Sequence, residues 1–186
     1  MYEAERSRLV KGLKSHGVVT DERVLEAMER VPRHEFLPSE LRDQAYVDSP
    51  LPIGMGQTIS APHMVGIMLQ ALELRPGHNV LEIGAGSGYH AALMGEMVRP
   101  GGKVYTVERL ESLGRKAAEA IERLSYDDVV EVVIADGSMG LPEHAPYDRI
   151  TVAAAAPEVP RPLEEQLADG GRMLVPVGGQ GNQDLT

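Results

Sequence analysis

The segment NVLEIGAGSGYH, residues 79–90, decides which fold the sequence predicts. Residues 79–83 form an apolar run typical of a buried strand, and residues 89–98 have the pattern of a helix. Between them lies the loop Gly84-Ala85-Gly86-Ser87-Gly88. Glycines at a strand-to-helix turn permit positive φ and let a ligand approach the backbone closely, so this loop is a candidate ligand site. The alternative is a tight turn that binds nothing.

The alternation of strand and helix continues along the chain after this segment. A strand is expected at 103–107 and a helix at 111–124, and three further strands are expected at 129–135, 147–154 and 172–177. Short strands that alternate with helices predict an α/β fold with a doubly wound, mostly parallel sheet and helices on both faces. Such a sheet binds its ligands at the carboxyl ends of the strands.

The residues before the glycine loop predict an N-terminal helical extension. Two amphipathic helices are expected at 3–16 and 21–31, and the Pro- and Gly-rich segment 32–57 is expected to be mostly loop. The chain is therefore expected to form one folding unit of two parts. The first part, residues 1–59, holds the helices and the loop, and the second, residues 60–186, is the core.

The composition argues against several kinds of partner. The chain of 186 residues has 28 acidic and 18 basic side chains, and its net charge of -10 disfavours binding to phosphate backbones. It has no cysteine, and no apolar run approaches the ~20 residues needed to cross a bilayer. Its six histidines lack the spacing of a metal site. We expect a cytoplasmic protein that binds no nucleic acid, membrane or metal.

The type of ligand is indicated by what the loop lacks and by two carboxylates. The dinucleotide pattern G-x-G-x-x-G would need glycine where Tyr89 stands, and the sequence has no G-K-[ST] phosphate loop. Glu108 ends the second strand and could bond both hydroxyls of a ribose, or could be a solvated charge. Asp136-Gly137 follows the third strand. The combination favours an adenosine ligand with a positively charged group, S-adenosylmethionine, and hence a class I methyltransferase.

Six segments resemble one enzyme family over nearly the whole chain: VPRHEFLP, LPIGMGQTISAPHM, VLEIGAGSGYHAA, VYTVER, APYDRI and LADGGRMLVPVG. They are similar to the protein-L-isoaspartate (D-aspartate) O-methyltransferases, which have the Rossmann-like methyltransferase fold. The resemblance implies methyl transfer from S-adenosyl-L-methionine, leaving S-adenosyl-L-homocysteine. The acceptor would be the carboxylate of L-isoaspartyl residues in damaged proteins or peptides, a reaction that initiates their repair.

The same resemblance implies roles for individual residues. Thr58, Ile59 and Ser60 would form the active-site loop as the catalytic residues, with Ser60 touching the substrate carboxylate. Ala135 stands where the family usually has glycine, and we expect it to be tolerated. The residues implied to bind the cofactor are Gly84, Ala85, Gly86, Ser87 and Gly88 for its methionine portion, Glu108 for its ribose, Asp136 and Gly137 for its adenine, and Arg109 and His63 as further members of the shell.

The chemistry agrees with the absence of charge from the segment GQTISAPHM, residues 56–64. A carboxylate with a usual pKa of ~3.9 is already ionised at neutral pH, so its methylation needs no general base. Its attack on a sulfonium destroys charge, so a dry pocket favours the reaction, whereas an Arg or Lys clamp would damp the nucleophile. Neutral donors such as Thr58 and Ser60 can position the anion instead. Ser60 is also expected to cap the helix that starts at Ala61-Pro62, and His63 is as consistent with packing as with ligand contact.

Two other functions remain open on the sequence. A class I methyltransferase for a small molecule would share the cofactor half of the site, and a non-catalytic domain could bind adenosine ligands or the damaged protein. The chain also ends shortly after the strand expected at 172–177, where the resembled family continues into a further antiparallel strand pair. We expect that pair to be absent and the protein to be a monomer, unless the open sheet edge pairs with another chain.

Overall fold

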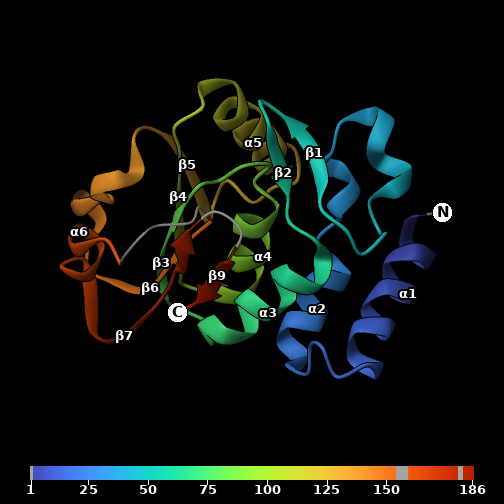
Figure 1. Cartoon of the computed structure of the whole chain (residues 1–186), viewed down its shortest axis with the longest axis horizontal. Helices are drawn as coiled ribbons and strands as arrows, with labels where there is room; N and C mark the ends of the chain where they lie inside the picture. Colours follow the sequence, from blue (N-terminus) through green and yellow to red (C-terminus); the bar gives the residue numbers. More distant parts are fainter. Residues whose placement is uncertain (1, 154–158, 180–181) are drawn as a thin grey trace.

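A five-stranded parallel sheet forms the centre of the computed structural model, which describes residues 2–153, 159–179 and 182–186. The strand order is β5-β4-β3-β6-β7 (Figure 1). The strands are β3 (Asn79–Ile83), β4 (Lys103–Glu108), β5 (Val130–Ile134), β6 (Tyr147–Val152) and β7 (Leu167–Leu174). The predicted α/β class with a doubly wound, mostly parallel sheet is therefore confirmed. Ala154, the last residue expected in β6, lies outside the described residues.

The two faces of the sheet are covered by different kinds of element. Along β3, Val80 packs into the core on one face and Leu81 into the core on the other, as the two-residue period of a strand requires. The Val80 face is covered by α3 (Pro62–Leu72), α4 (Tyr89–Val98) and α5 (Glu111–Arg123). The Leu81 face is covered by shorter helices, namely η3 (Gly137–Met139), η4 (Pro142–His144) and α6 (Arg161–Glu164).

The N-terminal residues add a second helical layer and a hairpin. Helices α1 (Tyr2–Ser15) and α2 (Glu22–Arg30) lie at the edge of the molecule away from β7, with α2 against α3 and α4 (Figure 1). The segment expected to be mostly loop contains η1 (Arg33–Phe36), η2 (Ser39–Gln44) and the antiparallel pair β1 (Leu51–Gly54) and β2 (Gln57–Ile59). The sequence pattern missed this hairpin because strands of three and four residues are too short for a periodic signal.

The C-terminal segment differs from its prediction. The strand expected at 172–177 begins earlier, as β7, and ends at Leu174. Pro176 then starts β8 (Pro176–Gly179), which pairs antiparallel with β9 (Asn182–Leu185) as a separate two-stranded sheet. An antiparallel strand pair is therefore present after β7, where we expected none, but it does not join the parallel sheet. Pro176 has no N–H to donate, which disfavours extension of the β7 ladder through that residue.

None of the helices in the described part of the chain combines the length and the apolar character needed to cross a bilayer.

Replacing Gly88 with Ala is expected to destabilise the protein more than the same change at Gly77, although both glycines have a φ of 86°. At Gly77 nothing lies within 4 Å of an added Cβ, so only the positive φ costs energy, about 1–2 kcal/mol. At Gly88 the added Cβ would lie 3.2 Å from the Cβ of Ala117 on α5, which raises the expected loss to about 2–4 kcal/mol. Urea unfolding of both variants measures the difference, and equal losses would mean that the contact with α5 relaxes freely.

Candidate functional site

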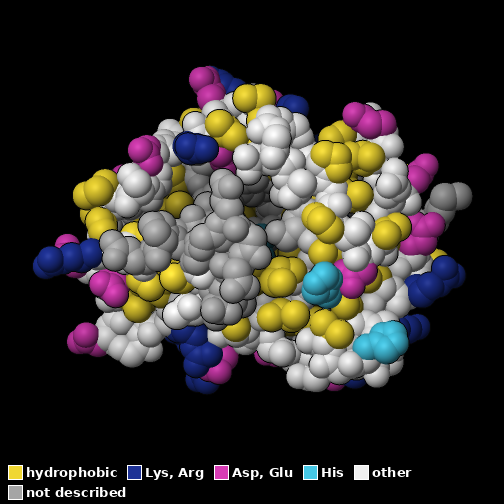
Figure 2. All heavy atoms as spheres, in the orientation of Figure 1, with side chains coloured by type: hydrophobic (Ala, Val, Ile, Leu, Met, Phe, Trp, Pro, Cys, Tyr) yellow, Lys and Arg dark blue, Asp and Glu magenta, His cyan; other side chains and the backbone are white. Residues whose placement is uncertain are grey.

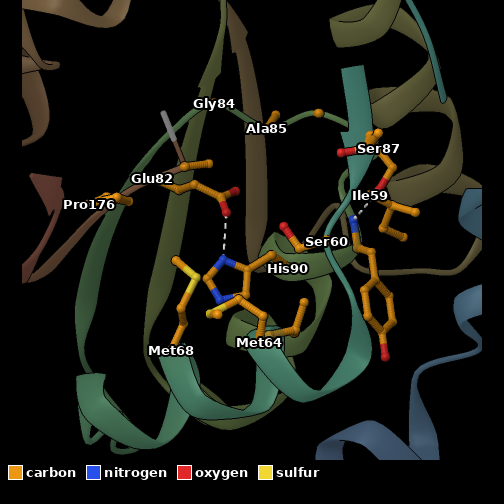
Figure 3. Close-up of a pocket in the computed structure, with 15 residues that line it drawn as sticks. Ile59, Ser60, Met64, Met68, Glu82, Gly84, Ala85, Ser87, His90 and Pro176 are labelled. Carbon is orange, nitrogen blue, oxygen red and sulfur yellow. Dashed lines mark hydrogen bonds and ion pairs between the residues drawn. The ribbon is translucent and has the colours of Figure 1, made fainter. Parts of the chain in front are cut away.

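A cavity of about 280 Å³ lies at the carboxyl end of β3, beside the glycine loop. Figure 2 shows the molecule hollowed near the centre of this face, with hydrophobic side chains beside the hollow. Figure 3 shows the side chains that surround it. The described residues that line it are Thr58, Ile59, Ser60, Met64, Val65, Met68, Glu82, Gly84, Ala85, Gly86, Ser87, Tyr89, His90, Ala153 and Pro176.

The glycine loop keeps a bare backbone against this cavity. Gly84, Gly86 and Gly88 all have positive φ, of 98°, 54° and 86°, so each favours the absence of a side chain. The N–H groups of Gly84 and Ala85 both donate to the carbonyl of Val107 on β4, which fixes the start of the loop. An added Cβ at Gly84 would lie 3.1 Å from the Cβ of Ala153. The loop therefore fits a ligand that must approach the backbone closely.

Glu108, at the end of β4, fixes the glycine loop through hydrogen bonds to backbone N–H groups. Its Oε2 accepts the Gly86 N–H at 2.9 Å and its Oε1 accepts the Leu110 N–H at 3.0 Å. The side chain is buried and is not among the residues that line the cavity. Each carboxylate oxygen can accept a second hydrogen bond, so the arrangement fits a ribose as well as fixing the loop. The sequence analysis left open that Glu108 is a solvated charge, and its burial contradicts this alternative.

Asp136 follows the neighbouring strand β5. Its carboxylate accepts the Ser138 N–H at 3.0 Å, and this hydrogen bond lowers the pKa of Asp136 below its ordinary value. Both Asp136 and Arg109 are exposed, whereas Gly137 is buried, and an added Cβ at Gly137 would lie 2.8 Å from the side chain of Ile83. These residues lie at the same edge of the sheet as Glu108 but outside the cavity.

Ala135, which precedes Asp136, fits its place without strain. Its N–H donates to the carbonyl of Glu108, and Ala135 is not among the described residues with positive φ. The local backbone therefore does not demand a glycine here.

Thr58, Ile59 and Ser60 bring the uncharged segment to the other side of the cavity. Thr58 and Ile59 belong to β2, and Ser60 follows it directly. Ile59 is buried, while Thr58 and Ser60 are exposed and have hydroxyls available to a ligand. The structure therefore brings these three predicted residues together with the loop residues Gly84, Ala85, Gly86 and Ser87.

The expectation that Ser60 caps α3 is wrong. The N-cap residue is Ala61, which has no side-chain cap. A carboxylate distant in sequence caps the helix instead: Asp48 Oδ1 accepts the backbone N–H of His63 at 2.9 Å. A partner fifteen residues upstream has no signature in the local sequence. The Ser60 hydroxyl is therefore free for another role.

His63 lies apart from the cavity lining. Its Nδ1 is 3.0 Å from Asp48 Oδ1, and its side chain is 40% exposed. The structure places this predicted cofactor-shell residue in a pair with Asp48 at the start of α3, outside the cavity lining.

Replacing Asp48 with Ala is expected to cost about 0.5–2 kcal/mol of stability, because it removes the acceptor for the first turn of α3. Asp48→Asn retains an acceptor oxygen and should lose less. Thermal unfolding of both variants at neutral pH measures this difference. A loss in Ser60→Ala as large as that in Asp48→Ala would instead return the capping role to Ser60.

Glu82, Tyr89 and His90 line the cavity and were not predicted as site residues. Tyr89 is buried, and burial raises its pKa to about 12. Glu82 and His90 contact each other, with Oε1 of Glu82 2.7 Å from Nδ1 of His90. The signal that could have found them is the acidic residue inside the apolar run NVLEI, since a buried carboxylate needs a partner. Among the described residues, no group of three or more His, Cys, Asp or Glu side chains could hold a metal.

A glycine loop after one strand of a parallel sheet, with a buried carboxylate at the end of the next, fits the cofactor site of a class I methyltransferase. A model of the family Protein-L-isoaspartate(D-aspartate) O-methyltransferase matches residues 4–186. The chain belongs to this protein-L-isoaspartate O-methyltransferase family.

Relatives and solved structures agree with this membership. The chain is 60% identical to a protein-L-isoaspartate O-methyltransferase of Aeropyrum pernix, covering 100% of this chain and 71% of that protein. It is 57% identical to the protein of the same name from Methanopyrus kandleri, covering 100% and 82%. A Plasmodium falciparum structure named as a beta-aspartate methyltransferase, in complex with S-adenosyl-L-homocysteine, matches with a TM-score of 0.86 at 29% identity, covering 97% and 87%.

Proposed function

We propose that this chain transfers a methyl group from S-adenosylmethionine to the carboxylate of L-isoaspartyl residues in damaged proteins or peptides. One observation carries the proposal: Thr58 and Ser60, the predicted substrate residues, line the same cavity as Gly84 and Gly86 of the predicted cofactor loop. Donor and acceptor can therefore meet in one cavity. Membership in the family supports the choice of acceptor.

The residues proposed to hold the cofactor have the chemical groups that its three parts need. The bare backbone from Gly84 to Gly88 would receive the methionine portion, Glu108 with Arg109 beside it the ribose, and Asp136 with Gly137 the adenine. When bound, S-adenosylmethionine supplies an electrophilic methyl group on a sulfonium. The complex of the Plasmodium falciparum neighbour with S-adenosyl-L-homocysteine supports this assignment.

The cavity residues then have two tasks, which are to orient the substrate carboxylate and to exclude water. Ile59, Met64, Met68 and Pro176 contribute apolar walls, which favour a reaction that destroys charge. Thr58 and Ser60 hydroxyls can donate to the carboxylate without neutralising it. No general base is required, because the carboxylate is ionised before it enters.

The test of this function is methyl transfer from labelled S-adenosylmethionine to matched peptides with one isoaspartyl or one aspartyl residue. We expect labelling of the isoaspartyl peptide and none of its aspartyl twin. The extra backbone carbon of the isoaspartyl residue moves the carboxylate relative to the peptide groups that hold it. Equal labelling of both peptides would favour the small-molecule methyltransferase, and labelling of neither by a folded chain would favour a non-catalytic binding domain.

The proposal extends to the organisation of the chain. We propose that residues 1–59 and 60–186 fold as one unit, which is supported by a shared hydrophobic core that includes Val10, Val24, Leu69 and Leu93. We also propose that the protein works as a monomer on isoaspartyl proteins. Sedimentation equilibrium at several concentrations tests the oligomeric state.

A further inference from the structure

The wall of the cavity contains a buried carboxylate, Glu82, which contacts an imidazole. Glu82 is 0% exposed, and it lies on the sheet face that α4 covers. The register of the sheet places it between Thr106 on β4 and Thr151 on β6. Thr106 Oγ1 donates to Glu82 Oε2 at 2.6 Å, and Nδ1 of His90 lies 2.7 Å from Oε1. Each oxygen of Glu82 therefore has a protein partner, and one of the two partners is an imidazole.

Among the described residues, none bonds to the second nitrogen of this imidazole. His90 Nε2 is buried and makes no hydrogen bond to that part of the chain, although the ring lines the cavity. The side chain of His90 is 13% exposed. Figure 3 shows its ring in contact with Glu82 and close to Ser60, Met64 and Met68. A buried polar atom without a hydrogen-bond partner is destabilising. A ligand group in the cavity that bonds to Nε2 would remove this destabilisation.

The charge of the cavity limits what that group can be. Among the described residues that line it there is neither Lys nor Arg, and His90 is the one side chain that can carry a positive charge. Protonated on both nitrogens, His90 donates to Glu82 through Nδ1 and carries a second N–H at Nε2, on a ring that lines the cavity. The imidazolium and the Glu82 carboxylate then form a pair with no net charge. Such a pair can donate a charge-assisted hydrogen bond while adding little net positive field to the site.

We propose that His90 Nε2 binds a carboxylate that enters this cavity. The inference rests on the proposed function, which brings two carboxylates here: that of the isoaspartyl residue and that of the cofactor's methionine portion. Either would accept the Nε2–H. A hydrogen bond to one oxygen of the isoaspartyl carboxylate would still leave the other oxygen free to attack. This contact differs from an Arg clamp, which can engage both oxygens.

The competing role for His90 is as an acceptor. A neutral imidazole that donates through Nδ1 to Glu82 would present a lone pair at Nε2, which could accept from the ammonium of the cofactor. The two roles respond oppositely to pH. Carboxylate binding needs the Nε2–H and should weaken when that proton is lost as pH rises, whereas ammonium binding needs the free lone pair and should strengthen. The ionisable residues that line the described cavity are Glu82, Tyr89 and His90, and its α3 and β2 sides contribute Met64, Met68, Thr58 and Ser60.

The test variant is His90→Gln, because its amide nitrogen can still donate to Glu82 while no second nitrogen reaches the cavity. The matched control is His144→Gln at the opposite end of the sheet, where His144 stacks on Tyr105 with ring centroids 4.0 Å apart. Circular dichroism and thermal unfolding first establish that both variants fold. If His90→Gln does not fold, His90→Asn and the pH dependence of the parent chain replace it.

Two measurements separate the sources of the carboxylate. Calorimetry compares S-adenosylmethionine with its decarboxylated analogue, and steady-state kinetics at saturating S-adenosylmethionine give KM for the isoaspartyl peptide. Loss of one charge-assisted hydrogen bond should weaken the affected affinity by about 10- to 100-fold in His90→Gln, with no change in His144→Gln. A reduced preference for S-adenosylmethionine over its analogue identifies the cofactor carboxylate, and a raised peptide KM identifies the substrate carboxylate.

Three outcomes would overturn the inference: both quantities unchanged in a folded His90→Gln, equal changes in His144→Gln, or parent affinities that strengthen as pH rises. In each of these cases methylation of isoaspartyl peptide by the parent chain would still stand. If the parent methylates no peptide, the proposed function fails, while the calorimetric comparison still tests His90.

Discussion

Ser60→Asp is expected to reduce methylation of isoaspartyl peptide by about 10³-fold. The new carboxylate would stand at the cavity wall beside the incoming substrate carboxylate. Two like charges about 4 Å apart repel by about 4 kcal/mol at an effective dielectric constant of 20, which corresponds to this loss of rate. The substitution also removes a hydroxyl donor. Initial rates of transfer from labelled S-adenosylmethionine measure the effect.

Two control variants separate this effect from a loss of structure. Ser60→Ala removes the donor without adding charge, so a reduced but measurable rate is expected. Ser112→Asp adds the same charge at an exposed position in the first turn of α5, where it should leave the rate unchanged. All three variants should keep the stability of the parent within about 0.5 kcal/mol, because Ser60 does not cap α3. If Ser60→Asp methylates as fast as the parent chain, Ser60 has no contact with the substrate.

Glu108→Gln is expected to weaken binding of S-adenosyl-L-homocysteine by about 10- to 150-fold. The carboxylate accepts from the N–H groups of both Gly86 and Leu110, and an amide can accept from only one of them. The other N–H would face a donor, and the ribose would lose a charged acceptor. Loss of the charge-assisted bond to the ribose costs about 1.5–3 kcal/mol of binding free energy, whereas the unsatisfied N–H lowers stability in the free and the bound protein alike. Isothermal titration calorimetry measures the affinity.

The matched control is Glu111→Gln, three residues further along the chain. Glu111 pairs with Arg115 on the exposed surface of α5 and contacts neither the loop nor the cavity. Its change should leave the affinity within about threefold of the parent value, because exposed ion pairs contribute little. Equal affinity in Glu108→Gln and in the parent would remove Glu108 from the cofactor site.

The sequence predicted the cofactor half of the site well because its features are local. A strand, three glycines and a helix follow one another within twenty residues, so their order alone places the loop at the end of β3. Glu108 could be placed at the same sheet edge by counting strands, since parallel strands end at the same side. Its two backbone contacts could not be predicted, because they depend on how the loop turns back toward β4.

The other half of the site depends on contacts between distant residues. The pattern gave no reason to place Asp48 under the first turn of α3, and Ser60 stood closer in sequence to the helix start. Likewise, Glu82 and His90 lie eight residues apart on a strand and a helix, and only the packing of α4 against the sheet brings them together. A polar residue inside an apolar run signals that a partner exists without saying which residue it is.

The sequence by itself therefore determined the α/β class, the glycine loop and the family, all of which depend on residues that are neighbours in the chain or on motifs of fixed spacing. The tertiary structure alone decided that Asp48 rather than Ser60 supports α3, that Glu108 holds the loop, and that His90 joins the cavity lining with a nitrogen that bonds to none of the described residues. The physical reason is that a hydrogen bond needs two atoms about 3 Å apart, and sequence periodicity fixes such distances only within one helix or strand.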